Sequence, residues 1–499
     1  MNVARNVCST STSLRFCSKT VVTAALGALL IAVAGCSSVP TYVAPSFEVP
    51  ATFKEGGTAF KRAEPERAVI DTPEQWWLLF DDPALDQLQA GALLGNANLQ
   101  AVAANVRIAQ AAVLGSRAAL FPTIGIGAGA TRSRSPILST QTAAGLAAPV
   151  TSYTAQALVS NWELDLWNRL GAQVDGAQAR LDATRADLAS ARLSLHATVA
   201  QTYFSLRAAE AQAALLDRSV EAFGRSAQLT KNRYSAGVVS AADVAQAEAQ
   251  LKSAEAQRVE ARLNRAQLEH ALATLTGTPP AAFALPATAK LPAPPAVPEQ
   301  LPSFLLERRP DIAAAERRVA AANAQIGAAN AAFFPAITLS ASAGLRSLTL
   351  GNLLKTTSNF WSIGPSLLWA AFDGGARRAA SDSARAAYDQ TVATYRQTVL
   401  VALQEVEDNL VAASALAEEV AIQQQALVAA QKAQEVALNQ YEAGIVSFIN
   451  VVTAQATVLS AETTLLNLQT RRLSAANTLL KNIGGRWDVK AECSTSAAR

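Results

Sequence analysis

The chain contains one short motif twice, and this duplication limits its possible folds more than any other feature. Arg233–Ser240 (RYSAGVVS) returns 207 residues later (440 − 233) as Gln440–Ser447 (QYEAGIVS). The same shift relates Gly277 to Gly484 and Trp162 to Trp369. Glycine can end a helix in the left-handed conformation, and the serine that follows can cap the next helix. Because long Ala-rich stretches flank both copies, each copy predicts the tip of a helical hairpin.

The stretches beside each tip predict unusually long helices. From about Arg169 to Tyr234 the chain has no proline, and at ~1.5 Å per residue such a helix spans on the order of 100 Å. A return helix is expected from about Ala241 to Leu275. Before the strands of the first repeat, a helix is expected to start at Asp82-Pro83 and to run to about Ala119. Apolar seam residues are spaced by four and three, as in a coiled coil: Leu195, Val199, Thr202, Leu206, Ala209, Ala213, Leu216, Val220, Phe223 and Ala227, then Val399, Leu403, Val406, Leu410, Ala413 and Ala417. Helices this long need partners along their length.

Two segments in each repeat alternate with a period of two residues, which predicts β-strands. Each has about the ~10 residues that cross a bilayer as a tilted strand. One set of alternating positions is largely apolar: Ile124, Ile126, Ala128, Ala130, Tyr153, Ala155, Ala157, Val159, Ile337, Leu339, Ala341, Ala343, Leu345, Trp361, Ile363, Pro365, Leu367 and Trp369. The other set is mostly small or polar, which suits a face in contact with water.

Four membrane-length strands cannot close a barrel by themselves. An open sheet edge in lipid leaves backbone groups unpaired at a cost of several kcal/mol each, so other copies of the chain must complete the sheet. A dimer would supply eight strands and a trimer twelve. Because eight strands leave little lumen, we expect a trimer with a twelve-stranded barrel.

The N-terminus predicts an export signal that ends in a lipidation site. Arg5, Arg15 and Lys19 precede an apolar run from Val21 to Gly35. The run ends in Val33-Ala34-Gly35-Cys36, which resembles a bacterial lipobox and predicts acylation of Cys36. The alternative is an ordinary secretory signal that happens to contain a cysteine.

Charge and histidine content argue against nucleic-acid binding and against catalysis. The chain has 42 basic and 39 acidic residues, and removal of the signal's three basic residues leaves no net charge. His196 and His270 lie in long helical patterns without metal-ligand spacing. Gly125–Ala130 mimics part of a dinucleotide-binding loop, but no helix follows it. We therefore predict no enzyme activity, no cofactor and no metal site.

The predicted segments give the chain an internal two-fold repeat. The fold class is mixed α and β but mainly helical, and each repeat consists of a helix, two strands and a long helical hairpin. The predicted boundaries are residues 1–35 for the signal, 36–75 for an acylated tether, 76–277 for the first repeat, 278–303 for a Pro-rich linker, 304–485 for the second repeat and 486–499 for a tail.

Several motifs together resemble one family. They are the lipobox, Pro40-Thr41-Tyr42-Val43-Ala44-Pro45, Trp76-Trp77-Leu78-Leu79-Phe80-Asp81-Asp82-Pro83, the strand entries Phe121-Pro122 and Phe334-Pro335, and the duplicated tips. In this combination the mature chain resembles the TolC-type outer-membrane efflux channels, in the lipoprotein subgroup that includes OprM and CusC (the NodT family). The resemblance implies a homotrimer with a barrel in the outer membrane and a helical tube in the periplasm. It also implies a periplasmic adaptor and an inner-membrane pump of the resistance-nodulation-division class as partners. Ser37 after the cysteine, in place of aspartate, implies the outer membrane.

The resemblance also implies roles for residues at the tips. Tyr234, Gly237, Tyr441 and Gly444 match the tip motif, which would shape the periplasmic entrance and meet the adaptor. Equally, glycine can simply form the turn while tyrosine packs beside it.

Candidate gate residues follow the tips. Asp243 either pairs across a closed entrance or serves as a solvated carboxylate in the first turn of a helix. Ile449 falls where the family places an apolar constriction, and Thr453 falls where it often carries aspartate. That departure weakens the idea of an acidic lock in this chain.

The leading hypothesis is an efflux duct for small molecules or ions. One alternative is a protein-secretion duct, which the lipobox disfavours because such ducts typically lack a lipid anchor. Another is a periplasmic scaffold without a pore, which the polar strand faces disfavour because a scaffold needs no wet lumen.

Overall fold

The computed structural model describes residues 40–46, 75–134, 149–295 and 309–483. The predicted lipid site Cys36 and the predicted tail lie outside these ranges. The described residues form two compact units. One contains residues 40–45, 108–134, 149–181 and 316–393, and the other contains the remainder. No helix among the described residues has the length and apolar character required to cross a bilayer.

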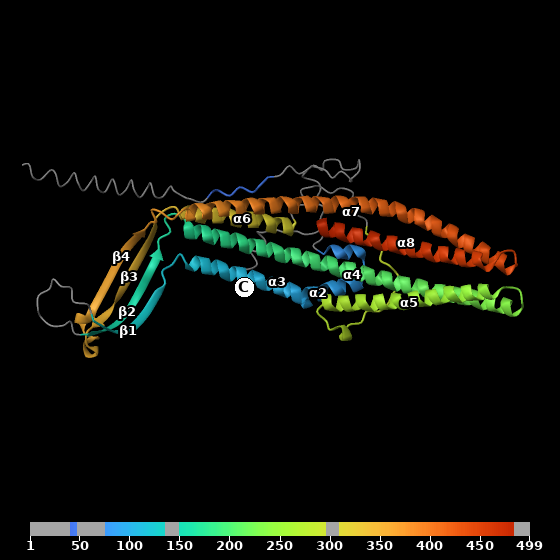
Figure 1. The fold of residues 1–499 in the computed structure, drawn as a ribbon, viewed down its shortest axis with the longest axis horizontal. Helices are drawn as coiled ribbons and strands as arrows, with labels where there is room; N and C mark the ends of the chain where they lie inside the picture. The colour runs from blue at the N-terminus through green and yellow to red at the C-terminus, as the bar shows by residue number, and fades with distance from the viewer. Residues whose placement is uncertain (1–39, 47–74, 135–148, 296–308, 484–499) are drawn as a thin grey trace, which may run out of the picture. The chain divides into compact units, whose positions relative to one another are not determined.

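The first unit contains a four-stranded antiparallel sheet (Figure 1). Its strands pair in the order β1-β2-β3-β4, with a register shift between Val159 and Trp162. Their bounds are β1 Ile124–Ser133, β2 Val150–Glu163, β3 Ala336–Ser347 and β4 Asn359–Leu368. Sequence periodicity thus predicted all four strands. The outer edges of β1 and β4 have no partner strand within the described part of the chain.

The strand register places the predicted apolar positions together on one face of the sheet. Ile126 lies opposite Ala157, which in turn lies opposite Ala343, and Ala343 pairs with Trp361. Gly127, Gln156, Gly344 and Phe360 form the neighbouring row on the opposite face. The predicted division into an apolar face and a mostly small or polar face is therefore present, although Phe360 is an aromatic exception.

The ends of the strands next to the helices repeat one tryptophan contact. Trp162 Nε1 donates to Leu120 O at 3.1 Å, and Trp369 Nε1 donates to Phe333 O at 3.2 Å. The two tryptophans are 207 residues apart, whereas the two carbonyls are 213 apart (333 − 120). The six-residue difference matches the longer connection between the strands of the first repeat. The duplication seen in the sequence thus extends to individual hydrogen bonds.

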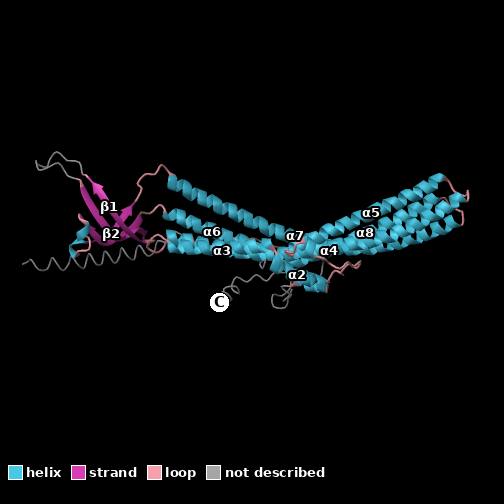
Figure 2. Cartoon of the chain, turned by 90° about the horizontal axis from the view of Figure 1, so that it is seen from below, coloured by secondary structure: helices cyan, strands magenta, loops and turns pink. Residues whose placement is uncertain are grey.

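Helices make up most of the remaining chain, as Figure 2 shows. They are η2 Trp76–Phe80, α2 Pro83–Gly95, α3 Ala97–Ala118, α4 Arg169–Ser235, α5 Ala241–Leu275, η3 Pro280–Ala282, α6 Pro310–Ala331, η5 Leu350–Asn352, η6 Thr356–Ser358, α7 Ala376–Glu442 and α8 Phe448–Ile483. The predicted long hairpins correspond to α4–α5 and α7–α8.

One predicted helix is two helices in the structure. The pattern from Asp82 to about Ala119 indicated a continuous helix, but the chain breaks at Asn96 between α2 and α3. Asn96 Oδ1 accepts a hydrogen bond from Leu99 N at 2.9 Å, which caps α3. Its Nδ2 donates to Leu275 O at 3.0 Å. The free energy gained from these two hydrogen bonds outweighs the helical tendency of the local sequence.

The short segment that follows the predicted lipid site lies against α6. Tyr42 donates its hydroxyl hydrogen to the Glu316 carboxylate, and Asn323 Nδ2 donates to Pro40 O at 2.9 Å. Burial and the hydrogen bond to Glu316 raise the pKa of Tyr42 above its usual range. Residues 40–46 are thus an extended segment fixed by side chains of the second repeat.

The main core of the second unit combines η2 and α2 with residues of α4, α5 and α8. Most of the predicted α4 seam is buried, including Val199, Leu206 and Phe223. The predicted α7 seam is less buried, since Leu403 and Leu410 are only half-buried. Outside this seam, α7 exposes apolar side chains that include Leu400, Val411 and Ile422. Leu400, Val411 and Ile422 recur every 11 positions, which is close to three helical turns. They form an apolar stripe without a partner in the described part of this chain.

His196 is one of the polar side chains in this core. Its ring stacks on Trp77 with 4.2 Å between centroids, and its Nδ1 lies 2.6 Å from Gln89 Oε1. Burial, together with the charge of Arg192, lowers the pKa of His196 to about 4. The ring is therefore neutral at pH 7, as expected for a structural core histidine.

The lowered pKa of His196 predicts destabilisation by acid. The unfolded chain takes up a proton near the ordinary histidine pKa, whereas the folded chain does so only near pH 4. We expect stability to fall by about 3 kcal/mol as the pH is lowered from about 6.5 to 4. His196→Gln should flatten the pH dependence of the chemical-denaturation midpoint. The matched change at the exposed His270 should leave it unaltered, and an equal response of the two variants would contradict the assignment.

Candidate functional site: the hairpin tips

The two hairpin tips have the same backbone structure. At the first tip, Gly237 has φ 76° and donates its N–H to Tyr234 O at 2.8 Å, while Val238 N donates to Arg233 O at 2.9 Å. At the second, Gly444 has φ 74° and makes the equivalent bond to Tyr441 O. These pairs of bonds form a Schellman motif, which satisfies the last carbonyls of α4 and α7. The sequence prediction of two glycine-ended helices is confirmed.

The return helices begin differently at the two tips. Ser240 Oγ accepts from Asp243 N at 3.2 Å, and Asp243 Oδ2 accepts from Ser240 N at 3.0 Å. This reciprocal pair is a capping box, so Asp243 serves here as a helix-start carboxylate. At the second tip the equivalent position is Asn450, whose Nδ2 lies 3.4 Å from Ser447 O.

The environments of the two tip tyrosines differ sharply. Tyr234 is 50 % exposed, whereas its repeat equivalent Tyr441 is 2 % exposed. Tyr441 packs against Phe448, with 5.3 Å between ring centroids, and belongs to a cluster that also contains Ala227 and Val451. That cluster takes residues from both hairpins. The second tip is therefore anchored on the first through Tyr441.

Arg233 holds this anchor in place. Its guanidinium lies 4.6 Å from the centre of the Tyr441 ring, and its Nη1 donates to Tyr441 O at 2.5 Å. The Tyr441 hydroxyl lies 3.3 Å from Thr230 Oγ1. Deeper in the hairpins, Gln455 Nε2 donates to the Ser226 hydroxyl at 2.8 Å. Thr230, Ser226 and Gln455 belong to no motif, so the sequence gives no signal for this contact.

The candidate gate residues Ile449 and Thr453 lie on the first turns of α8 and are exposed. Thr453 Oγ1 donates to Ile449 O at 2.8 Å, within its own helix. Near them the tips expose Val238 and Ile445. Asp243, Ile449 and Thr453 thus belong to one end of the two hairpins. In Figure 1 the loops of both hairpins lie at that end.

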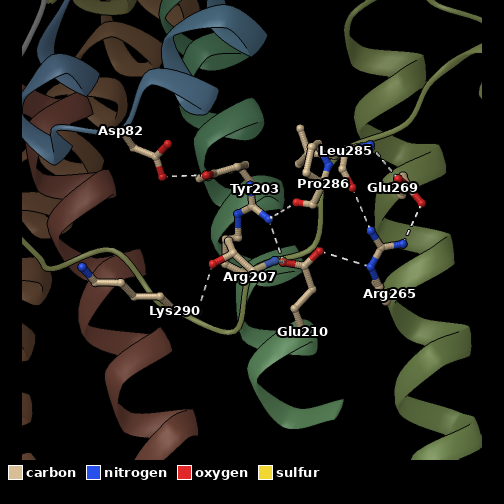
Figure 3. A network of polar contacts seen from close by, with 10 residues as sticks. Asp82, Tyr203, Arg207, Glu210, Arg265, Glu269, Leu285, Pro286 and Lys290 are labelled. Carbon is tan, nitrogen blue, oxygen red and sulfur yellow. Dashed lines mark hydrogen bonds and ion pairs between the residues drawn. The ribbon is translucent and has the colours of Figure 1, made fainter. Parts of the chain in front are cut away.

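A second polar cluster lies far from the tips, where the inter-repeat linker crosses α4 and α5 (Figure 3). Arg207 Nη1 lies 2.7 Å from Glu210 Oε2, and the two side chains are 5 % and 3 % exposed. Glu210 also accepts from Arg265 Nε at 3.1 Å and from Thr288 N at 3.0 Å. A single buried carboxylate therefore joins two helices and the linker.

The same cluster satisfies the backbone of the linker. Arg207 donates to Pro286 O at 2.9 Å, and Arg265 donates to Leu285 O at 3.0 Å. Leu285 N donates to Glu269 Oε1 at 2.9 Å. Because prolines remove backbone donors and prevent regular structure, this linker depends on side chains for its position.

The fold and the tips define a class of protein. A sheet with one apolar face and two unpaired edges requires both lipid and further copies of the chain. The long hairpins, which end in a shared tip cluster, form a second part of the protein that is helical. Together these features indicate a subunit of a membrane-inserted channel.

Comparisons with known proteins identify the family. The model of the family described as outer membrane efflux protein matches residues 89–278 and 301–485. The chain is 33 % identical over 455 residues to the antibiotic efflux pump outer membrane protein ArpC of Pseudomonas putida, with 91 % of this chain and 93 % of that protein covered. It is 32 % identical, also over 455 residues with the same coverage, to the toluene efflux pump outer membrane protein TtgC of the same species.

A solved structure shares the fold. The MtrE outer membrane channel of Neisseria gonorrhoeae, solved in its open state, matches with a TM-score of 0.76 and 31 % identity. The match covers 90 % of this chain and 98 % of MtrE. The chain belongs to the outer membrane efflux protein family, and its function as an outer membrane efflux channel follows. The resemblance stated from the sequence motifs is confirmed.

Proposed function

We propose that three copies of the chain form the exit duct of a tripartite efflux system. The observation that carries this proposal is the sheet, with an apolar face, a face of mostly small or polar residues and two edges that have no partner strand among the described residues. Three copies would join β1 of one to β4 of the next and close twelve strands around a lumen. The unpartnered apolar stripe on α7 supports side-by-side packing of helices between copies.

The partners and the anchor form the second part of the proposal. Cys36 carries the acyl chains in the outer membrane. The tips, with Tyr234, Gly237, Tyr441 and Gly444, meet a periplasmic adaptor, and an inner-membrane pump of the resistance-nodulation-division class delivers the cargo. The cargo consists of small organic molecules, because the names of two relatives specify antibiotics and toluene. The duct itself performs no chemistry.

The tip contacts support a gate at the periplasmic entrance. Arg233 and Tyr441 hold the second tip against the first, and Ile449 and Thr453 are exposed on the first turns of α8 beside them. Asp243 keeps the return helix of the first tip capped. In the resting duct these contacts favour the closed arrangement, and the adaptor shifts the population towards the open one.

Removal of Arg233 is expected to open the duct. Arg233→Ala deletes both the ring contact and the hydrogen bond to Tyr441, and a loss of ~1.4 kcal/mol raises the open-to-closed ratio about tenfold. Single-channel recording of the purified protein in planar bilayers, after its oligomer mass is measured, would show longer and larger openings. The control is Arg225→Ala, because Arg225 is exposed on the same helix.

Two results would contradict the proposal in different ways. If Arg233→Ala and an Ile449→Ser/Asp243→Ala double variant both conduct like the wild type, the gate is assigned to the wrong residues. If a trimer never conducts, even with both tips altered, the chain is a scaffold and not a duct.

A further inference from the structure

The loop end of the sheet carries positive charge without any acidic residue. Residues 121–162 and 333–372, which contain all four strands except Glu163, include four basic residues and no aspartate or glutamate. The four are Arg132, Arg134, Arg346 and Lys355. All of them lie towards the end where β1 joins β2 and β3 joins β4, and all are exposed. Nothing in the sequence of these segments neutralises them.

The opposite end of the sheet is organised differently. There, Glu163 pairs with Arg169 at 2.6 Å, and Asp373 pairs with Arg377 at 2.6 Å. Charges next to the helices therefore occur as ion pairs, whereas no acidic side chain contacts Arg132, Arg134 or Lys355 within the described ranges. The loop end has an excess of cations that the described residues do not compensate.

The strand register separates these cations between the two faces. Arg132 continues the apolar row of β1 that begins with Ile124 and Ile126, because alternate residues share a face. Arg134 follows two residues later, just beyond the strand. Arg346 belongs to the other face, where its guanidinium lies 4.8 Å from the centre of the Phe360 ring. Arg132 thus ends the apolar face, with Arg134 just beyond it in the chain, and Arg346 ends the polar face.

The length of β1 determines the depth in the membrane at which Arg132 lies. Eight residues separate Ile124 from Arg132, or about 26 Å at ~3.3 Å per residue. A strand tilted by ~40° rises about 20 Å over that length, close to the ~25 Å apolar band of an outer-membrane sheet. If Ile124 lies at one boundary of the band, Arg132 reaches the other, where a long side chain can extend to the headgroups.

We propose that Arg132 and Arg134 bind the phosphate groups of the phosphorylated glycolipid that forms the outer leaflet. The proposal rests on the proposed function, since it requires the apolar face to contact an outer membrane. A guanidinium offers paired N–H donors that match a phosphate, and two adjacent arginines can engage one headgroup. Three copies of the chain would place such a pair at three positions around the rim.

The test uses full-length protein in detergent with bisphosphorylated lipid A as the probe and native mass spectrometry as the measurement. Because two cations beside an anionic headgroup are lost, Arg132→Gln/Arg134→Gln should bind the lipid about 10- to 30-fold more weakly. The matched control is Arg346→Gln/Lys355→Gln, which removes two cations from the same end of the sheet and should retain wild-type affinity. Dephosphorylated lipid A should bind the wild type and both double variants with the same affinity.

Equal weakening by both double variants would overturn the proposal, because it would indicate general attraction to the rim. Unchanged binding in Arg132→Gln/Arg134→Gln would overturn it as well. If that variant fails to assemble, Arg132→Lys/Arg134→Lys replaces it. That variant keeps the charge but loses the paired donors, and it should show intermediate affinity. Conductance in planar bilayers should be unaffected in Arg132→Gln/Arg134→Gln, so a failed lipid site can be distinguished from a failed duct.

Discussion

Replacement of Glu210 by alanine is expected to lower the free energy of unfolding by about 3–5 kcal/mol. The change removes the carboxylate that faces Arg207, Arg265 and the N–H of Thr288. Arg207 would remain buried beside two neutral partners, Pro286 O and Tyr203, whose ring centre lies 4.8 Å away. A charge that has lost its counterion inside a protein is strongly destabilising, whatever the net value of the intact pair.

Two measurements check this expectation in detergent-solubilised protein. The midpoint of chemical denaturation, followed by the helical signal in circular dichroism, should fall. Trypsin should cleave faster after Lys290, because Glu210 holds the neighbouring Thr288. Glu210→Gln keeps one acceptor for Thr288 N and should lose less stability. The exposed Glu221 lies on the same helix, and Glu221→Ala is the control that should change neither readout.

A methyl group at Gly277 is expected to cost about 2–5 kcal/mol. Gly277 has φ 72°, where alanine is strained by about 1–2 kcal/mol, and its added Cβ would lie 2.1 Å from Gly95 O. Overpacking of this kind adds about 1–3 kcal/mol. The end of α5 and the end of α2 approach each other here through two glycines, and neither backbone can move without disturbing the Asn96 contact to Leu275.

Two other glycines of the chain serve as controls that separate the cost of backbone strain from the cost of the steric clash. Gly237 has nearly the same φ, but a Cβ there would meet nothing within 4 Å, so Gly237→Ala should show only the conformational cost. Gly95→Ala should show mainly the clash, because its Cβ would lie 2.1 Å from Thr276 O. The free energies of unfolding of the three variants would be compared. A cost at Gly277 equal to that at Gly237 would refute the role of close approach.

Much of the fold could be predicted because its signals are local. The tips follow from glycine and serine at fixed positions, and the strands follow from alternation along ten residues. The break at Asn96 was missed because its cause, a hydrogen bond to Leu275, comes from a residue 179 positions away. The Glu210 cluster was missed for the same reason, since its members come from two helices and the linker and form no motif.

Local sequence patterns were enough to predict two helical hairpins, two pairs of membrane-length strands and near-identical tips. That the two tips are not equivalent emerged only from the way the helices pack. Tyr234 and Tyr441 occupy the same place in the repeat, yet one is exposed and the other is buried under Arg233. The repeat has glutamine at position 440 where the first copy has Arg233, which marks the asymmetry in the sequence without explaining it. The physical reason is that each hairpin uses a different face to pack against the other. The two tips therefore have the same backbone structure but different neighbours.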